Sequence, residues 1–284
     1  MTGCFVGLCT VDLQYVVAEF PRPNQKVSAS RQELTAGGPA TNAAVTFSYL
    51  GGEASLITSL GDHSLASIAR QDLDQHGVAL HDLAEDRLAA PAVSSILVHA
   101  QTGERTVVSM NAAANPVSVS KFKTDSLAGA SILLVDGHHM PLCIAAAKAA
   151  RESGIVVVLD GGSWKEGMSD LLPHVQVAIC SEDFNPGPHV HAAQFLREQG
   201  ITKVAITRGP KSILWFSEES TGELPVAQIP ARDTTGAGDI FHGAFCWAYA
   251  NGTEFTKSLA FASQVATRSC LHYGTRQWMK NGAR

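Results

Sequence analysis

One short string in this chain has the residue types needed for phosphoryl chemistry, Asp233-Thr234-Thr235-Gly236-Ala237-Gly238-Asp239. Glycines that open a helix leave backbone N–H groups unpaired, and the helix dipole adds positive potential there, so this turn predicts an anion site. A carboxylate at the same helix start would repel a bound phosphate unless it had a function of its own. Because a carboxylate that reaches both a phosphoryl group and a hydroxyl can accept the hydroxyl proton, we expect Asp239 to be a catalytic base. Gly236, Ala237 and Gly238 would form the phosphate cradle beside it.

The elements that must position this string follow the pattern of an α/β protein. Short apolar runs recur at 5–11, 55–60, 132–135, 155–159, 175–179 and 204–206. Their continuous rather than alternating apolarity predicts strands buried on both faces, as in a parallel sheet. Helical segments lie between them. We therefore expect a doubly wound, mainly parallel sheet sandwiched by helices, forming a single domain over residues 1–284.

Two further segments, 27–34 and 93–110, alternate apolar and polar residues, and the second contains a turn at 101–104. This pattern predicts hairpin strands outside the main sheet. Because the first segment follows the first predicted strand and precedes a glycine-rich turn, we expect a small β-sheet lid formed by roughly 13–36 and 91–112. Exposed edges and apolar faces of such a lid favour a homodimer through it.

Carboxylates follow two of the predicted strands, Asp12 at the end of the first and Asp136 after the run at 132–135. Ligands in open α/β sheets bind beyond the carboxyl ends of strands, so both are candidate substrate ligands, although an Asp in this position can also cap the following helix. Arg105 in the lid is a candidate contact for an anionic substrate.

Residues 233–243 resemble the signature of the ribokinase-like (PfkB) carbohydrate kinase family, in which the last Asp of the string is the catalytic base. A second motif, Gly37-Gly38-Pro39-Ala40-Thr41-Asn42, resembles the family's N-terminal glycine motif. The resemblance extends over nearly the whole chain. It implies an ATP-dependent kinase that phosphorylates a hydroxyl of a small sugar, with Asp12, Gly37, Gly38 and Asn42 on the sugar.

The same resemblance places the nucleotide. Thr207-Arg208-Gly209 resembles the family's nucleotide loop, and residues 262–274 resemble its adenine-side helix and turn. It therefore implies nucleotide contacts from the residues Thr207, Arg208, Gly209, Thr235, Gly236, Gly238, Ser263 and Gly274.

Metal ions are also implied by the resemblance. Asp233 and Thr235 stand at the positions of a monovalent cation site, so K⁺ is expected beside the anion site, although Asp233 could simply cap the turn. For Mg²⁺ the family often has Asn-x-x-Glu, whereas Ser181-Glu182-Asp183-Phe184 stands here. Phe184 replaces the Glu, and Glu182 or Asp183 could take its place, with Glu182 the candidate for the Mg²⁺ shell.

Composition limits the partners. A net charge of −5 and a pI near 6.1 give no basic surface for a nucleic acid. No apolar stretch reaches the roughly 20 residues of a membrane helix. The six cysteines form no C-x-x-C pair, which indicates a reducing compartment, and we expect a cytoplasmic protein.

The sequence argues against two other nucleotide-binding classes. A dinucleotide-binding dehydrogenase would need G-x-G-x-x-G after the first strand, and a P-loop enzyme would need a Gly-Lys pair; the sequence has neither. Within the kinase family a nucleoside or sugar phosphate could be the acceptor. Only Tyr15 and Phe20 offer aromatic rings near the lid, which favours a ketose or related carbohydrate. Phe184 also leaves open a non-catalytic relative that only binds a sugar or a nucleotide.

Overall fold

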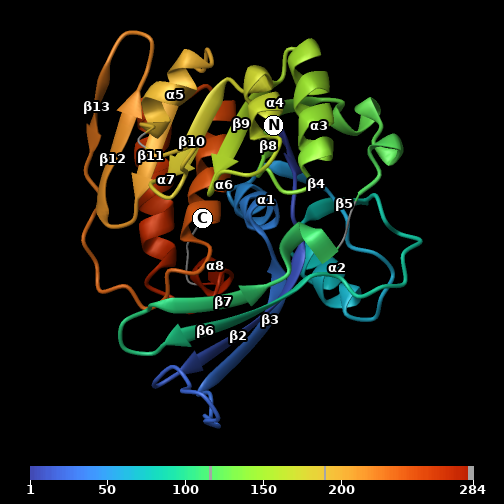
Figure 1. Cartoon of the computed structure of the whole chain (residues 1–284), viewed down its shortest axis with the longest axis vertical. Coiled ribbons are helices and arrows are strands. Elements are labelled where there is room, and N and C mark those ends of the chain that lie inside the picture. Colours follow the sequence, from blue (N-terminus) through green and yellow to red (C-terminus); the bar gives the residue numbers. More distant parts are fainter. Residues whose placement is uncertain (115–116, 189, 281–284) are drawn as a thin grey trace.

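A nine-stranded, mainly parallel sheet forms the body of the molecule in the computed structural model, which describes residues 1–114, 117–188 and 190–280 (Figure 1). The strand order is β13-β12-β11-β10-β9-β8-β1-β4-β5. The strands are β1 (Thr2–Val6), β4 (Glu53–Thr58), β5 (Val78–Asp82), β8 (Ala130–Val135), β9 (Val156–Gly161), β10 (Val177–Ser181), β11 (Lys203–Arg208), β12 (Lys211–Phe216) and β13 (Thr221–Leu224). Only β12 and β13 pair antiparallel, at one edge. The predicted α/β fold is confirmed.

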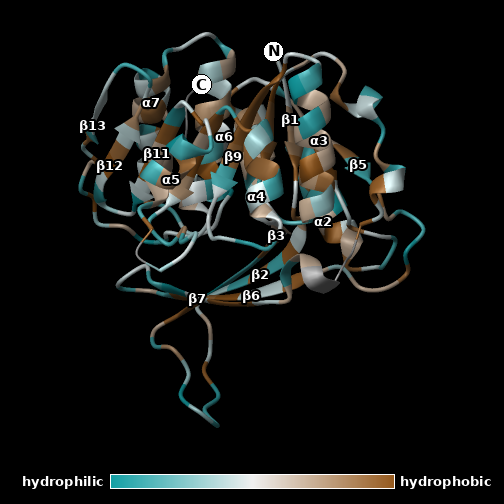
Figure 2. Ribbon diagram, turned by 45° about the horizontal axis from the view of Figure 1, so that its top comes forward, coloured by the Kyte–Doolittle hydropathy of each residue, from teal (hydrophilic) through white to brown (hydrophobic). Residues whose placement is uncertain are grey.

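Helices cover both faces of this sheet because alternate strand residues point to opposite sides. Phe5 of β1 belongs to one core, and Cys4 and Val6 belong to the other. The first core is shared with α1 (Pro39–Tyr49), α2 (Ala66–Gln75), α6 (Ala237–Ala250), α7 (Phe255–Ser269) and α8 (Gln277–Lys280), and the second with α3 (Met140–Glu152), α4 (Met168–Leu171) and α5 (Ala192–Glu198). Short 3₁₀ helices lie at η1 (Asn111–Ala114), η2 (Val119–Lys121), η3 (Thr124–Leu127) and η4 (Leu172–His174). Figure 2 shows the resulting hydrophobic strands between helices with hydrophilic outer faces.

The predicted lid is a second sheet of four strands, which lies below the body in Figure 1. Its order is β3-β2-β6-β7, formed by β2 (Thr10–Val17), β3 (Arg31–Gly37), β6 (Val93–His99) and β7 (Arg105–Ser109). The residues Asp12, Gln14 and Val16 pair with Ser94, Ile96 and Val98, and this face is buried toward the body. None of the described helices has both the length and the hydrophobicity needed to span a bilayer.

The predicted strand at 5–11 is wrong in its extent. The main-sheet strand ends at Val6, and the chain turns at Gly7, where a Cβ would collide with the carboxylate of Asp136. Because only glycine allows this close approach, β1 stops there and β2 leaves for the lid. Asp12 therefore lies within a lid strand and not at the end of a main-sheet strand.

Other differences concern strands with weak patterns. The first lid hairpin strand after β2 begins at Arg31, four residues later than the alternation at 27–34 suggested. Strands β5, β12 and β13, which lie at or next to the edges of the sheet, were not expected, because strands there bury less surface and so carry a weaker apolar signal.

Helices α1 and α6 approach each other closely at Gly243. A Cβ on this residue would lie 2.7 Å from Cβ of Thr46 and 2.9 Å from Cα of Ala43, both in α1. The absence of a side chain therefore sets the separation of the two helices whose first turns carry Asn42 and Asp239.

We expect Gly243→Ala to lower the free energy of unfolding by about 1–3 kcal/mol, because overpacking would push α6 away from α1. Chemical denaturation measures the change. Gly187→Ala is the matched control, because its Cβ would lie 3.5 Å from Val190, an ordinary contact distance. Equal stability of the Gly243→Ala and wild-type proteins would contradict the packing described.

Candidate active site

The glycine turn that precedes α6 is open to a ligand. Gly236 caps the helix with φ of 68°, a left-handed conformation that favours glycine, and a Cβ there would lie 2.7 Å from Thr275. Gly238 is exposed, and a Cβ built on it would meet nothing within 4 Å. The start of α6 therefore combines the positive end of a helix dipole with free space, as an anion site requires.

Asp239 lies in the first turn of α6 and is joined to the other glycine motif. Nδ2 of Asn42, in α1, donates a hydrogen bond of 2.8 Å to Oδ2 of Asp239. Within the described residues nothing donates to the other oxygen, Oδ1. The two motifs found in the sequence thus meet through Asn42 and Asp239, 197 residues apart, at one carboxylate that keeps an oxygen free.

Asp12 faces the body from the inner side of the lid. Its carboxylate packs against Cα of Gly37, where a Cβ would collide, and Oδ1 accepts a 2.6 Å hydrogen bond from Thr10. Burial, chiefly, raises the pKa of Asp12, and the negative charge of Asp239 adds to the increase. Gly38, with φ of 100°, precedes α1 and lies against the carbonyl of Leu8.

Asp136 lies beneath the site and has a structural role. It is 1% exposed, and its carboxylate accepts hydrogen bonds from the backbone N–H groups of Leu8 (2.9 Å), Ala40 (3.2 Å) and His138 (2.8 Å). These contacts fix the end of β8 against the turn after β1 and the start of α1. We therefore do not retain Asp136 among the candidate sugar ligands.

Asp233 caps the glycine turn and also contacts the lid. Its Oδ1 accepts the N–H of Thr235 at 2.8 Å, and its Oδ2 accepts the N–H of Gly274 at 2.8 Å and a bond from Nε2 of Gln14 in β2. A second lid contact is a 2.7 Å bond from Nη1 of Arg105 to Oγ1 of Thr234. The lid is therefore fastened to the same turn that forms the anion site.

A comparison with known proteins gives the family. The sequence profile of the pfkB family carbohydrate kinases matches residues 3–281. The chain belongs to the pfkB family of carbohydrate kinases. It is 25% identical to mouse (Mus musculus) ribokinase over 95% of this chain and 89% of that protein.

Solved structures of other proteins have a similar fold. A putative ribokinase from Agrobacterium tumefaciens aligns with a TM-score of 0.83 and 24% identity over 99% of both chains. A putative ribokinase II from E. coli, in complex with ATP and Mg²⁺, aligns with a TM-score of 0.81 and 17% identity over 100% of this chain and 96% of that one. These similarities show the α/β fold with its lid.

In this pfkB kinase the residues predicted to hold the nucleotide lie at the carboxyl end of β11 and on α7. Thr207 donates to the carbonyl of Cys180 at 3.3 Å, and Nε of Arg208 donates to the carbonyl of Ser212 at 2.7 Å. Gly209, with φ of 58°, makes the turn into β12. Ser263 is buried in α7. Their roles in nucleotide binding remain predictions.

The segment that departs from the family pattern forms part of the core. Phe184 is 2% exposed and packs edge-on against Trp164, with ring centroids 5.5 Å apart. The carboxylate of Glu182 is exposed and lies 3.2 Å from Nζ of Lys211. Among residues 1–114, 117–188 and 190–280, no group of three or more His, Cys, Asp or Glu side chains could hold a metal ion.

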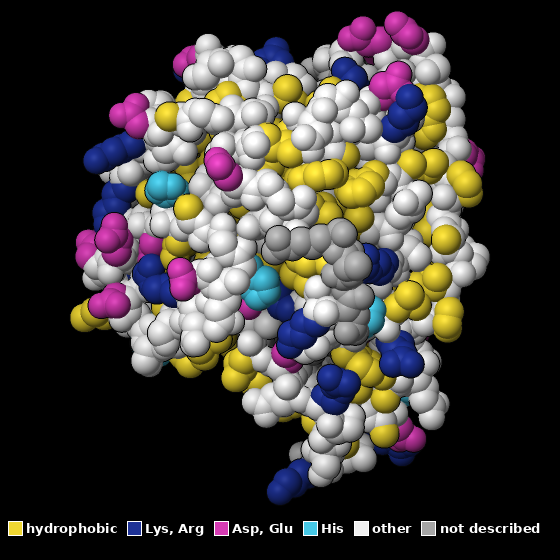
Figure 3. Space-filling model, turned by 180° about the vertical axis from the view of Figure 1, so that it is seen from behind, with side chains coloured by type: hydrophobic (Ala, Val, Ile, Leu, Met, Phe, Trp, Pro, Cys, Tyr) yellow, Lys and Arg dark blue, Asp and Glu magenta, His cyan; other side chains and the backbone are white. Residues whose placement is uncertain are grey.

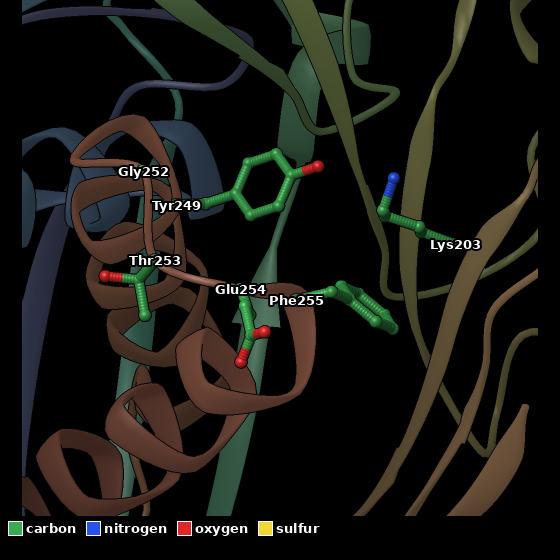
Figure 4. Close-up of a pocket in the computed structure, with 6 residues that line it drawn as sticks. All are labelled: Lys203, Tyr249, Gly252, Thr253, Glu254 and Phe255. Atoms are coloured by element: carbon green, nitrogen blue, oxygen red, sulfur yellow. The ribbon is translucent and has the colours of Figure 1, made fainter.

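A surface hollow lies elsewhere. It is lined by Lys203, Tyr249, Gly252, Thr253, Glu254 and Phe255, at the amino end of β11 and the end of α6 (Figure 4). None of the predicted site residues lines it. The candidate site is thus identified by its polar contacts and its glycines, and not by this hollow.

Sequence reasoning did not select a buried pair behind the anion turn, Asp160 and His242. Nδ1 of His242 lies 2.7 Å from the carbonyl oxygen of Gly238 and 3.4 Å from Oδ2 of Asp160, and Nε2 lies 3.1 Å from the carbonyl oxygen of Ile179. The ring therefore fixes the carbonyl of the anion turn. Burial raises the pKa of Asp160 to about 6.

This elevated pKa predicts how Asp160 affects stability. Between pH about 4 and 6 the folded chain keeps a proton on Asp160 that the unfolded chain releases. The stability that this bound proton contributes is therefore present at low pH and is lost as the pH rises from about 4 through 6. Asn does not titrate. We expect the free energy of unfolding of Asp160→Asn, relative to wild type, to increase across this range by up to about 3 kcal/mol.

Urea titrations at pH values from 4 to 8 measure this difference. Asp74→Asn, at an exposed position of α2, is the control and should show no such trend. A difference between Asp160→Asn and wild type that is constant with pH would contradict the elevated pKa.

Proposed function

We propose that the chain transfers the γ-phosphoryl group of ATP to a hydroxyl of a small sugar, a ketose or a related carbohydrate. The observation that carries the proposal is the position of Asp239. It stands in the first turn of α6, one oxygen is held by Asn42, the other is free, and the open glycine turn lies directly before it.

The reaction requires one proton transfer and one displacement. The sugar hydroxyl oxygen bonds to the γ-phosphorus while the bond from that phosphorus to the bridging oxygen breaks, so ADP leaves with that electron pair. The hydroxyl proton passes to Oδ1 of Asp239. Because phosphoryl transfer has a loose transition state, the hydroxyl becomes acidic late, and a well-placed weak base is sufficient. The residues 236–238 bind the negative charge of the transferred group.

Nucleotide binding is assigned to the carboxyl end of β11, to α7 and to the turn after α7, through Thr207, Arg208, Gly209, Ser263 and Gly274. The E. coli relative with ATP and Mg²⁺ supports these cofactors. Mg²⁺ commonly binds through substrate phosphates and one or two carboxylates, which fits a chain with no dedicated cluster of ligands in its described part. Glu182, whose carboxylate is exposed, is the candidate ligand, and the ion would neutralise phosphate charge when bound.

The surroundings of Asp233 fit a monovalent cation such as K⁺. Its carboxylate is 2% exposed, yet no Lys, Arg or His forms an ion pair with it in the described part of the chain. Oγ1 of Thr235 is buried there without a hydrogen-bond partner. A buried charge is stabilised by a counter-charge, which K⁺ would supply next to the anion site.

The inner face of the lid favours a sugar over a nucleoside. Its strand residues include Asp12, Ser94 and Ser109, and the two serine hydroxyls lie 3.2 Å apart. By the strand register none of the lid-strand residues on this face is aromatic, so a base would find no stacking partner there. Gly37, Gly38 and Asn42 complete the proposed sugar pocket.

A substrate panel tests the proposal. ATP turnover should be measured with ketoses, aldoses, sugar phosphates and nucleosides, and we expect the highest kcat/KM with a ketose or a related sugar acid. Arg105, on the same lid face, would favour an anionic sugar. A nucleoside as the best acceptor would support the alternative kinase, and binding of sugar or ATP without any turnover would support a non-catalytic relative.

We expect Asp239→Asn to reduce kcat by roughly 10²- to 10⁴-fold, the usual contribution of general acid-base catalysis. Asn keeps the shape and the oxygen that accepts from Asn42 but removes the proton acceptor. ATP affinity, measured by calorimetry, should be retained or increased because a negative charge beside the phosphates is gone. Asp74→Asn is the matched control. A kcat within about threefold of wild type, well short of that range, would show that Asp239 is not the base.

We also propose that the lid forms a homodimer. By the strand register its outer face presents Leu13, Tyr15, Leu34, Leu97 and Val108, of which Leu34 is 45% exposed and Val108 is 70% exposed. Seen from behind, hydrophobic side chains reach the surface of the lower part of the molecule among Lys and Arg side chains (Figure 3). Such a face is stabilised by burial against a second copy.

Sedimentation at tens of micromolar, roughly where a standard-size interface holds, should give the mass of a dimer for the wild type. Leu34→Lys should give a monomer, because a charge in an apolar interface loses its hydration. Leu88→Lys, at a 75% exposed leucine outside the lid, is the control and should remain dimeric. A monomeric wild type would exclude the lid dimer.

A further inference from the structure

We propose that Arg276 is a positioning residue for Asp239, acting through the side-chain amide of Asn42. The inference rests on the proposed function, since it concerns how the base is held during transfer. Arg276 follows the turn at Gly274 and lies outside the motifs found in the sequence, yet its side chain is buried behind the site, with 4% exposure.

The guanidinium group of Arg276 donates hydrogen bonds in two directions. Toward α1, Nη1 donates to Oδ1 of Asn42 at 2.9 Å and to Oγ1 of Thr275 at 2.9 Å. Toward the lid, Nη2 donates to the carbonyl oxygen of Ala36 at 2.9 Å. One planar group therefore connects α1, the end of the lid strand β3 and the turn before α8.

Its charge is balanced by Asp72 of α2. Oδ2 of this carboxylate accepts from Nε at 3.1 Å and from Nη2 at 3.0 Å, and His76 contacts the same carboxylate. Burial acts to raise the pKa of Asp72, but His76 and Arg276 outweigh it and the pKa is lowered. Because both ions are paired and hydrogen-bonded, the guanidinium can remain buried.

The chemistry of Arg276 determines the orientation of the Asn42 amide. A guanidinium has only donors, so the Asn42 atom that faces it must be the acceptor Oδ1. The amide nitrogen then faces Asp239, and it donates to Oδ2 at 2.8 Å. In the opposite orientation two N–H groups would face each other at Arg276, and two oxygens would face each other at Asp239.

This orientation has two consequences for catalysis. The bond to Oδ2 fixes the rotation of the Asp239 carboxylate and leaves Oδ1 for the substrate proton. The second hydrogen on Nδ2 of Asn42 can donate to a substrate, so Asn42 selects an acceptor oxygen at that point. Lysine cannot replace Arg276, because an ammonium lacks the planar fork that serves acceptors on two sides.

The test is Arg276→Lys, which keeps the positive charge opposite Asp72. With the best sugar of the panel, kcat should fall by about 10- to 100-fold through misplacement of the base, while KM for ATP stays within roughly twofold. Arg70→Lys is the matched control: Arg70 pairs with Asp82 and donates to the carbonyl of Gly61, away from the site, and its replacement should leave kcat unchanged. Wild-type kcat in Arg276→Lys would overturn the proposal.

A double-variant cycle separates positioning from general destabilisation. If Arg276 acts through Asn42, adding Arg276→Lys to Asn42→Ala should lower kcat by no more than roughly twofold further. Effects that multiply would overturn the proposal. Should Arg276→Lys fail to fold, Asn42→Asp keeps an oxygen for Arg276, replaces the donor to Asp239 by an oxygen and adds a negative charge beside that carboxylate. Its kcat should fall at least tenfold, and an unchanged kcat would equally overturn the proposal.

A readout independent of turnover distinguishes this inference from the proposed function. In the ¹H–¹⁵N spectrum the side-chain amide signal of Asn42, assigned by its loss in Asn42→Ala, should shift in Arg276→Lys and in Asp239→Asn but not in Arg70→Lys. If the wild type phosphorylates no sugar, the proposed function fails, and this signal alone decides the positioning role. An Asn42 signal unaffected by Arg276→Lys would overturn it.

Discussion

The close contact between α1 and α6 at Gly243 is the constraint on which the site depends. Packed helices lie about 8–10 Å apart, depending on the side chains at the contact, and the missing side chain at Gly243 lets α1 and α6 approach closely. Both helices begin at the same edge of the sheet with a glycine turn. Because the contact lies one turn beyond Asn42 and Asp239, it sets how far apart these side chains start. The hydrogen bond between them is a consequence of this packing.

Buried carboxylates organise the loops around that contact. Asp136 and Asp233 each accept three N–H hydrogen bonds, and two of the three donors to each come from segments distant in the sequence. Each carboxylate accepts hydrogen bonds from N–H groups of several segments, and so joins these segments. Burial raises the pKa values of Asp12 and Asp160, and the negative charge of Asp239 adds to the increase in both.

The sequence predicted the α/β fold, the lid and both glycine motifs, because these depend on local patterns. Apolar runs mark buried strands, and glycines before a helix mark anion sites. The strand at 5–11 was overextended because Gly7 interrupts it for a tertiary reason, the approach of Asp136. The partners of Asp233 and the role of Phe184 in the core likewise depend on contacts between distant segments. Arg276 gave no signal at all, because a single arginine after a turn resembles any surface residue until its neighbours are known.

The contacts between lid and body have a kinetic consequence. Gln14 and Arg105 extend from the lid to acceptors in the 233–238 turn, and the carbonyl of Ala36 in β3 accepts from Arg276. Lifting the lid would break all three bonds, and two of the groups left behind, the carboxylate of Asp233 and the guanidinium of Arg276, are buried. An unsatisfied buried group costs about 1–3 kcal/mol, and more if it is charged. These contacts therefore favour the closed arrangement in the free protein, and each opening of the lid, whether to admit a sugar or to release a phosphorylated product, must break all three bonds.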